Sequence, residues 1–137
     1  MPTTGYSGTP LAKKLGIKTG YKIKTYGAPD HYFDLFQDWP DNVEMVKKPD
    51  LESLDFIHVF TIDSHALETL VPQAKPALKK NGSFWVSWPK GSSGFQTDIN
   101  RESIRDFVLK IGLVDVKVAA VDENWSGLKF MYRTVDR

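Results

Sequence analysis

The stretch Leu54-Asp55-Phe56-Ile57-His58-Val59-Phe60-Thr61 is almost continuously apolar. A run of this length without polar alternation is typical of a strand that is covered on both faces, as in parallel sheets. A second strand of this kind is expected over 83–88, and apolar residues at helical spacing lie between the two. A strand, a helix and a strand in this order join parallel strands through a right-handed crossover. The centre of the chain therefore predicts a βαβ unit.

The flanking sequence extends this pattern in both directions. Further helices are expected over 10–15, 31–39 and 100–111, and further strands over 21–26, 43–46, 114–120 and 128–135. The helix over 31–39 would begin after Asp30 and bury the aromatic side chains of Tyr32, Phe33, Phe36 and Trp39. Only a short link joins the last two strands, so they should be antiparallel. The prediction is an α/β fold with a mostly parallel open sheet of about six strands, an antiparallel C-terminal pair and helices on both faces.

The composition sets the class of protein. The 137 residues fit one domain over 1–137, with a loose segment over 1–8. The net charge of +1 provides no global field that would attract nucleic acid or an anionic membrane, so neither is expected as a partner. The chain has no cysteine and no apolar run long enough to span a bilayer, and its first residues do not form a signal peptide. A cytoplasmic location is expected.

Three strings are similar to those of class I methyltransferases, whose sheet is Rossmann-like. Residues 15–23 (LGIKTGYKI) resemble the approach to the first strand of that class. Residues 78–86 (LKKNGSFWV) resemble its step from a helix into the fifth strand, and residues 112–114 (GLV) resemble its C-terminal end. The resemblance implies a methyltransferase-like scaffold.

The span from Tyr6 to Arg133 also resembles a bacterial family known as domain of unknown function 3052. The strings that carry this resemblance are 6–11 (YSGTPL), 86–90 (VSWPK), 112–117 (GLVDVK) and 125–129 (WSGLK). The family supplies no activity and no assigned site. The resemblance therefore supports the fold and the compartment, and it leaves the function open.

The chain departs from the methyltransferase pattern where the cofactor would bind. The glycine-rich turn after the first strand is replaced by Gly27-Ala28-Pro29-Asp30, which keeps one glycine. The acidic residue expected after the second strand is replaced by Lys47 and Lys48. One strand–helix unit is missing between 47 and 54. The scaffold is therefore expected to be truncated, with no cofactor and without S-adenosylmethionine-dependent methyl transfer.

A ligand of such a sheet binds outside the carboxyl ends of the strands. The segments 28–31, 63–65, 88–94 and 122–126 are expected to meet at that edge. The candidate ligand-binding residues in them are Asp30, His31, Trp88, Lys90, Ser92, Trp125 and Ser126. In this hypothesis Trp88 and Trp125 form aromatic walls and Lys90 binds an anion. Alternatively, both tryptophans complete the core and Lys90 is solvated.

Asp63 and His65 are candidates for general acid–base catalysis, because a carboxylate and an imidazole lie two residues apart at a strand end. The alternative is that Asp63 caps the following helix. His58 lies inside a strand and is expected to be a hydrogen-bonded core residue. The three histidines lack the spacing of a structural zinc site, so no metal is expected.

Three functions remain open on this basis. The first, which we favour, is a non-catalytic domain that binds a small ligand or a protein partner at the tryptophan-lined edge. The second is a diverged transferase-type enzyme that acts on a small anionic or aromatic substrate. The third is an assembly module that forms a homodimer through the half-exposed last strand pair.

Overall fold

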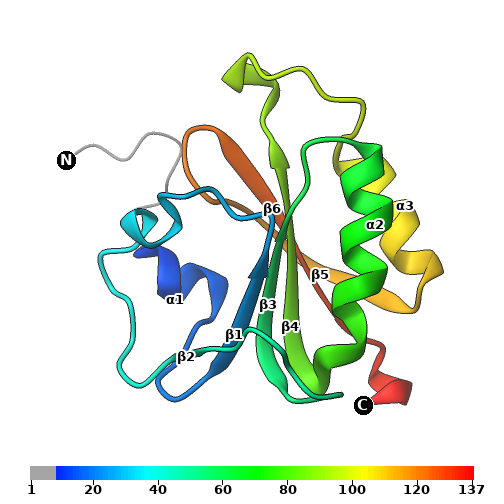
Figure 1. The fold of residues 1–137 in the computed structure, drawn as a ribbon. Helices are drawn as coiled ribbons and strands as arrows, with labels where there is room; N and C mark the ends of the chain where they lie inside the picture. Colours follow the sequence, from blue (N-terminus) through cyan, green and yellow to red (C-terminus); the bar gives the residue numbers. More distant parts are fainter. Residues whose placement is uncertain (1–8) are drawn as a thin grey trace.

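Six strands form one sheet in the order β2-β1-β3-β4-β6-β5, with helices on both faces (Figure 1). The computed structural model describes residues 9–137, so the segment 1–8 that was expected to be loose lies outside the described residues. The strands β2, β1, β3 and β4 are parallel, and β6 is antiparallel to both β4 and β5. The elements are α1 (Leu11–Leu15), β1 (Lys22–Tyr26), the 3₁₀ turn η1 (Tyr32–Leu35), β2 (Glu44–Met45), β3 (Leu54–Phe60), α2 (Ser64–Ala74), η2 (Lys75–Ala77), β4 (Leu78–Pro89), η3 (Gly91–Ser93), α3 (Arg101–Lys110), β5 (Leu113–Ala120), β6 (Trp125–Tyr132) and η4 (Thr134–Asp136). The predicted fold class is confirmed.

The predicted first residues of β4 and β6, the two strands that pair antiparallel, are corrected. The strand β4 begins at Leu78 rather than at residue 83, and β6 begins at Trp125 rather than at residue 128. Trp125 pairs with Pro89 across the two strands, which extends the ladder to the carboxyl end of β4. Trp125 is therefore a strand residue with a fixed side-chain direction.

The helix expected over 31–39 is wrong, since only the single turn η1 forms there. No side chain caps its start, and Phe36 already has extended backbone angles. The chain must return from the end of β1 to the start of the parallel strand β2, which requires an extended path. The aromatic residues of this segment pack on one another instead: the ring of Tyr32 lies 5.2 Å from that of Phe36, and Trp39 lies 4.9 Å from Phe36.

The sheet separates two apolar clusters. On one face α2 and α3 pack over β3, β4 and β6, with Leu67, Val71 and Val108 fully or almost fully buried. On the other face lie α1 and η1, and the Nε1 of Trp85 donates a hydrogen bond of 2.9 Å to the carbonyl of Leu15. This bond attaches α1 to the centre of β4.

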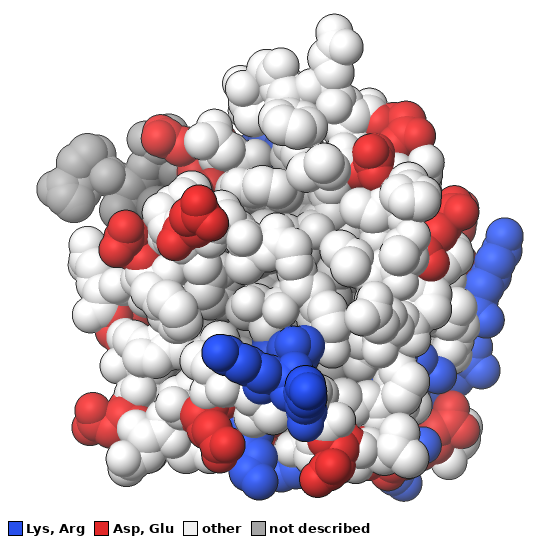
Figure 2. All heavy atoms as spheres, viewed as in Figure 1, with Lys and Arg blue, Asp and Glu red and all other residues white. Residues whose placement is uncertain are grey.

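The missing strand–helix unit leaves one face of β1 without a helix. The loop from β2 to β3 crosses this face instead, and Lys24 donates from Nζ to the carbonyl of Lys47 at 2.8 Å. Between this loop and α2 lies a groove of about 380 Å³, with Tyr26 and Gln73 in its wall. Figure 2 shows basic side chains gathered in the lower centre of this face. The open face explains why β1 has lysines at alternating positions.

The strand β5 forms the outer edge of the antiparallel end. A bulge interrupts its pairing with β6 between Asp115 and Lys117, and the extra residue, Val116, is 49% exposed. At the other edge β2 has only two residues. None of the helices within residues 9–137 has the length and apolar character needed to cross a bilayer.

Candidate functional site

The topology brings the ends of β1, β3 and β4 and the start of β6 to one edge of the sheet, at the top of Figure 1. The rings of Phe60 and Trp125 meet edge to face with centroids 5.0 Å apart. The amide of Lys90 donates to the carbonyl of Asn124 at 2.8 Å. Ser64, at the start of α2, donates from its backbone nitrogen and its hydroxyl to the carboxylate of Asp98. Loops from distant parts of the chain are thus joined at this edge.

A pocket of about 220 Å³ lies at this edge, between β4, the loop that follows it and the start of β6. We call it the strand-end pocket, and its lining residues are Pro89, Ser93, Phe95, Asn124 and Trp125. Phe95 is 52% exposed, whereas Trp125 is half-buried. Two aromatic rings and neutral polar groups therefore surround the space.

Short hydrogen bonds hold the backbone around the strand-end pocket. The Oγ of Ser93 donates to the carbonyl of Lys90 at 2.7 Å and accepts from the amide of Phe95 at 3.1 Å. The carboxylate of Asp122 accepts from the amides of Asn124 and Trp125, both at 2.8 Å. Asp122 therefore closes the turn before β6 and positions two of the lining residues.

The structure does not bring Trp88 and Trp125 together, which corrects the expectation of two aromatic walls in one site. Side chains alternate along a strand, and Trp88 pairs with Ser126 while Trp125 pairs with Pro89. Trp88 is only 8% exposed and packs in the cluster under α2 and α3, whereas Trp125 belongs to the cluster on the opposite face. Trp88 and Ser126 therefore lie on the wrong face to line the strand-end pocket.

The Asp63 carboxylate has a structural role at the start of α2. Its Oδ1 accepts a hydrogen bond of 2.8 Å from the amide of Ala66, which caps α2. His65 is exposed on α2, and within residues 9–137 no hydrogen bond or ion pair joins it to Asp63. The alternative of a helix cap accounts for Asp63, and the geometry does not supply an acid–base pair.

The other candidates lie at the predicted edge with exposed side chains. Asp30 and His31 are exposed in the loop after β1, and Ser92 is exposed in η3. Sequence reasoning missed Ser93, Phe95 and Asn124 as lining residues. Phe95 carried a usable signal, because it is a lone aromatic residue in a polar loop. No three His, Asp or Glu side chains gather as metal ligands would in the part of the chain that the structure describes.

A buried hydrogen-bonded chain lies beneath this edge, on the α1 face. The Nε2 of His58 lies 2.8 Å from the Oγ of Ser87, and its Nδ1 lies 3.1 Å from the hydroxyl of Tyr32. Burial lowers the pKa of His58 to about 3 and raises the pKa of Tyr32. His58 and Ser87 are fully buried and Tyr32 is 3% exposed, so no substrate reaches this pair of base and hydroxyl. The prediction that His58 is a hydrogen-bonded core residue is confirmed.

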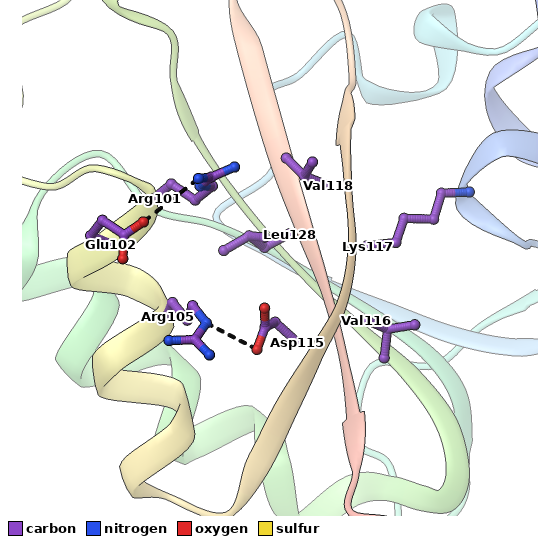
Figure 3. A pocket seen from close by; sticks show the side chains of 8 residues that line it. All are labelled: Arg101, Glu102, Arg105, Asp115, Val116, Lys117, Val118 and Leu128. Carbon is purple, nitrogen blue, oxygen red and sulfur yellow. Dashed lines mark ion pairs between the residues drawn. The ribbon is translucent and has the colours of Figure 1, made fainter.

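A second hollow, of about 340 Å³, lies between α3 and the outer strands (Figure 3). Its two arginines are paired with carboxylates: Arg105 lies 3.1 Å from Asp115, and Arg101 lies 3.6 Å from Glu102. Each guanidinium group of the hollow therefore already lies beside a carboxylate. Lys117 points away from these groups, to the other side of β5 (Figure 3).

Solved structures with a similar fold include proteins described as methyltransferases. A SAM-dependent methyltransferase from Aquifex aeolicus has a TM-score of 0.59 and 14% identity over 90% of this chain and 88% of its own. DhpI in complex with SAH has a TM-score of 0.61 and 9% identity over 91% of this chain and 83% of its own. A TehB-like SAM-dependent methyltransferase from Corynebacterium glutamicum has a TM-score of 0.55 and 11% identity over 84% of this chain and 82% of its own. The chain has a truncated methyltransferase-like Rossmann fold.

These identities establish the fold alone. No protein-family model matches the chain, and no curated protein sequence matches it. The resemblance to domain of unknown function 3052 therefore stays a prediction. The methyltransferase-like scaffold is supported by the structural similarity.

Two positions of this scaffold depart from the sequence pattern of S-adenosylmethionine sites in the fold class. Gly27 has a φ of +68°, and a Cβ on it would lie 2.7 Å from the carbonyl oxygen of Phe60. This glycine is thus required by the packing of the turn on β3. The adjacent ring of Tyr32 is buried against Phe60, with centroids 5.7 Å apart. Lys47 stands after β2, where a carboxylate would bind the ribose.

Proposed function

We propose that this chain is a non-catalytic binding domain on a methyltransferase-like scaffold, and that it binds a small flat ligand in the strand-end pocket. The observation that carries the proposal is the placement of Phe95 and Trp125 around one small cavity at the carboxyl edge of the sheet. Phe95 is 52% exposed and lines this cavity. An exposed aromatic side chain at a cavity rim is typical of a site that stacks on a ring.

The size and polarity of the pocket define the ligand class. Pockets for drug-sized ligands usually measure about 300–1,000 Å³. A cavity of about 220 Å³ fits one ring system rather than a whole dinucleotide. The amide of Asn124 and the hydroxyl of Ser93 supply neutral donors and acceptors to the edge of a heterocycle.

Two titratable side chains near this edge support binding without catalysis. Asp63 caps a helix, and the only buried base near the edge, His58, is sealed among aromatic rings within the described residues. A general acid or base must reach the reacting group within hydrogen-bonding distance.

The absence of cysteine agrees with the cytoplasmic location that we propose for the protein.

The test uses adenosine, nicotinamide and indole as probes, with binding followed by calorimetry and by tryptophan fluorescence. We expect at least one probe to bind, and Phe95→Ala to weaken it about tenfold, because removal of one stacking ring costs about 1–3 kcal/mol. Trp125→Ala should weaken the same probe, although this variant also loses a contact with Phe60. Phe33→Ala is the matched control, because Phe33 is 51% exposed and does not line the pocket. Equal binding by the wild type and by Phe95→Ala would reject the site.

The second candidate function is binding of S-adenosylmethionine, and the fold similarity to SAM-dependent methyltransferases favours it. The turn at Gly27 and the lysine after β2 argue against it, as described above. Titration with S-adenosylmethionine in a calorimeter separates the two candidates. Saturable binding that survives Phe95→Ala would support the second candidate and contradict the first.

A further inference from the structure

The groove between α2 and the loop from β2 to β3 lies on the face of β1 that the missing strand–helix unit leaves without a helix. We call it the crossover groove. The strand β1 supplies its floor through Lys24 and Tyr26, the loop supplies one wall with Lys47 and Leu51, and the end of α2 supplies the other wall with Gln73. Parallel sheets are normally covered by helices on both faces. On this side β1 therefore lacks the cover that α2 gives to its neighbour β3.

Apolar side chains beside the crossover groove are incompletely buried. Tyr26, Val46 and Leu70 pack against the apolar cluster under α2 and α3, and all three are only partly buried. Leu51, in the wall of the groove, is 77% exposed, and no other leucine within residues 9–137 is exposed. Apolar side chains of a partner that entered the groove would remove this area from water, which favours association.

The dimensions of the crossover groove fit a helix. The five residues of β1 extend over about 16 Å, and the 11 residues of α2 extend over about the same length. A helix of about three turns beside α2 would therefore follow β1 from end to end. The volume of about 380 Å³ holds a few side chains rather than a backbone. Such a helix would lie along the rim and insert the side chains of one face.

The crossover groove carries a net positive charge. Lys24 and Lys47 line it together with one carboxylate, that of Asp50. The Nζ of Lys24 lies 4.9 Å from the centroid of the Tyr26 ring and donates to the carbonyl of Lys47 at 2.8 Å. No ion pair within the described residues 9–137 includes either lysine. The basic side chains in the lower centre of Figure 2 lie over this loop, so carboxylates would complement the rim.

We infer that the crossover groove binds an amphipathic helix of a partner protein, with glutamate or aspartate on both sides of its apolar stripe. This helix takes the place of the missing helix beside α2. Its apolar side chains contact Tyr26 and Leu51, and its carboxylates pair with Lys24 and Lys47. None of these four residues lines the strand-end pocket, so the inference goes beyond the proposed function and does not depend on it.

The probe is a synthetic peptide of about 18 residues, long enough to be helical in water, with leucine along one face and glutamate on both sides of it. A second peptide has lysine in place of every glutamate. Binding of each peptide to the full chain is measured by calorimetry at low and at physiological salt. We expect the glutamate peptide to bind at least about tenfold more tightly than the lysine peptide, and the difference to shrink as the salt is raised.

Two variants at exposed positions locate the binding site. Leu51→Ala should weaken the glutamate peptide about tenfold through the lost apolar contact. Its matched control is Ile62→Ala, because Ile62 is 45% exposed and does not line the groove. Lys47→Glu should weaken the glutamate peptide about tenfold and strengthen the lysine peptide by a similar factor. Its matched control is Lys110→Glu, because Lys110 is an exposed lysine at the end of α3. Urea unfolding checks that each variant is folded.

Each other outcome overturns the inference. Equal binding of the two peptides, or no binding of either, would remove the charge complementarity on which it rests. Binding that Leu51→Ala leaves unchanged would place the peptide elsewhere. A dimer in sedimentation that Leu51→Glu converts to a monomer would make a second copy of this chain the occupant. Tighter binding of a thymidylate strand of about 12 residues would make the groove a polyanion site. Phe95→Ala should leave peptide binding unchanged, so the strand-end pocket is tested separately.

Discussion

Acidification should begin to destabilise this protein through His58 at a pH above the range in which carboxylates titrate. The imidazole is fully buried between Ser87 and Tyr32, and its pKa is lowered to about 3. The ordinary pKa of histidine, which applies to the unfolded chain, is about 6.5. At a pH between these two pKa values, His58 binds a proton in the unfolded chain and stays neutral in the folded chain. The stability is therefore complete above pH 6.5 and is lost as the pH falls toward 3.

The size of the effect follows from the two pKa values. Each pH unit within the window lowers the free energy of unfolding by about 1.4 kcal/mol. Lowering the pH from about 7.5 to about 5 should therefore remove about 2 kcal/mol, since only the part below 6.5 counts fully. A loss of this size is a large fraction of the usual stability of a small domain, which is about 5–15 kcal/mol.

The assay is urea unfolding, followed by tryptophan fluorescence, at a series of pH values. The double variant His31→Gln/His65→Gln makes His58 the sole histidine, because the chain has three. Its imidazole signal can then be followed by NMR over the same range. An NMR midpoint near 6.5, or equal unfolding free energies at the two ends of the range, would refute the reasoning.

Three further predictions concern the edge of the sheet. Gly27→Ala should lower the free energy of unfolding by about 1–2 kcal/mol in urea titrations, because the positive φ of Gly27 and the carbonyl of Phe60 both oppose a Cβ. Gly91→Ala should have little effect, because no atom lies within 4 Å of the position that its Cβ would take. Asp63→Ala should cost about 1 kcal/mol of unfolding free energy through the lost cap of α2, and calorimetry should find probe binding unchanged. Trp88→Ala should cost about 3–5 kcal/mol in the same denaturation assay, as expected for a core residue, and a loss below 1 kcal/mol would contradict its placement.

The central strands were predictable because burial on both faces leaves a simple pattern. The apolar runs at 54–61 and 83–88 required a covered parallel sheet, and the shortage of residues before Leu54 indicated the missing strand–helix unit. The aromatic spacing over 32–39 is compatible both with a helix and with the observed turn. Periodicity could not separate the two, since the path back to β2 is a tertiary constraint.

The candidate site was predictable in its location but not in its members. Trp88 and Trp125 are both at the carboxyl edge, yet the register that pairs Trp125 with Pro89 places them on opposite faces. A shift of one residue in register exchanges the two faces of a strand, and this register cannot be read directly from the sequence. Phe95 was missed because its loop has no periodicity that would indicate its direction.

The bulge at Val116 has a consequence for the behaviour of the protein at high concentration. An outer strand offers unpaired backbone groups to any extended chain, but β5 is interrupted in its middle at Val116. A neighbouring molecule that approached along β5 would meet an irregular ladder. Deleting Val116 would restore a regular strand beside the exposed Val118, and the edge would then offer an unbroken row of backbone groups to a second strand.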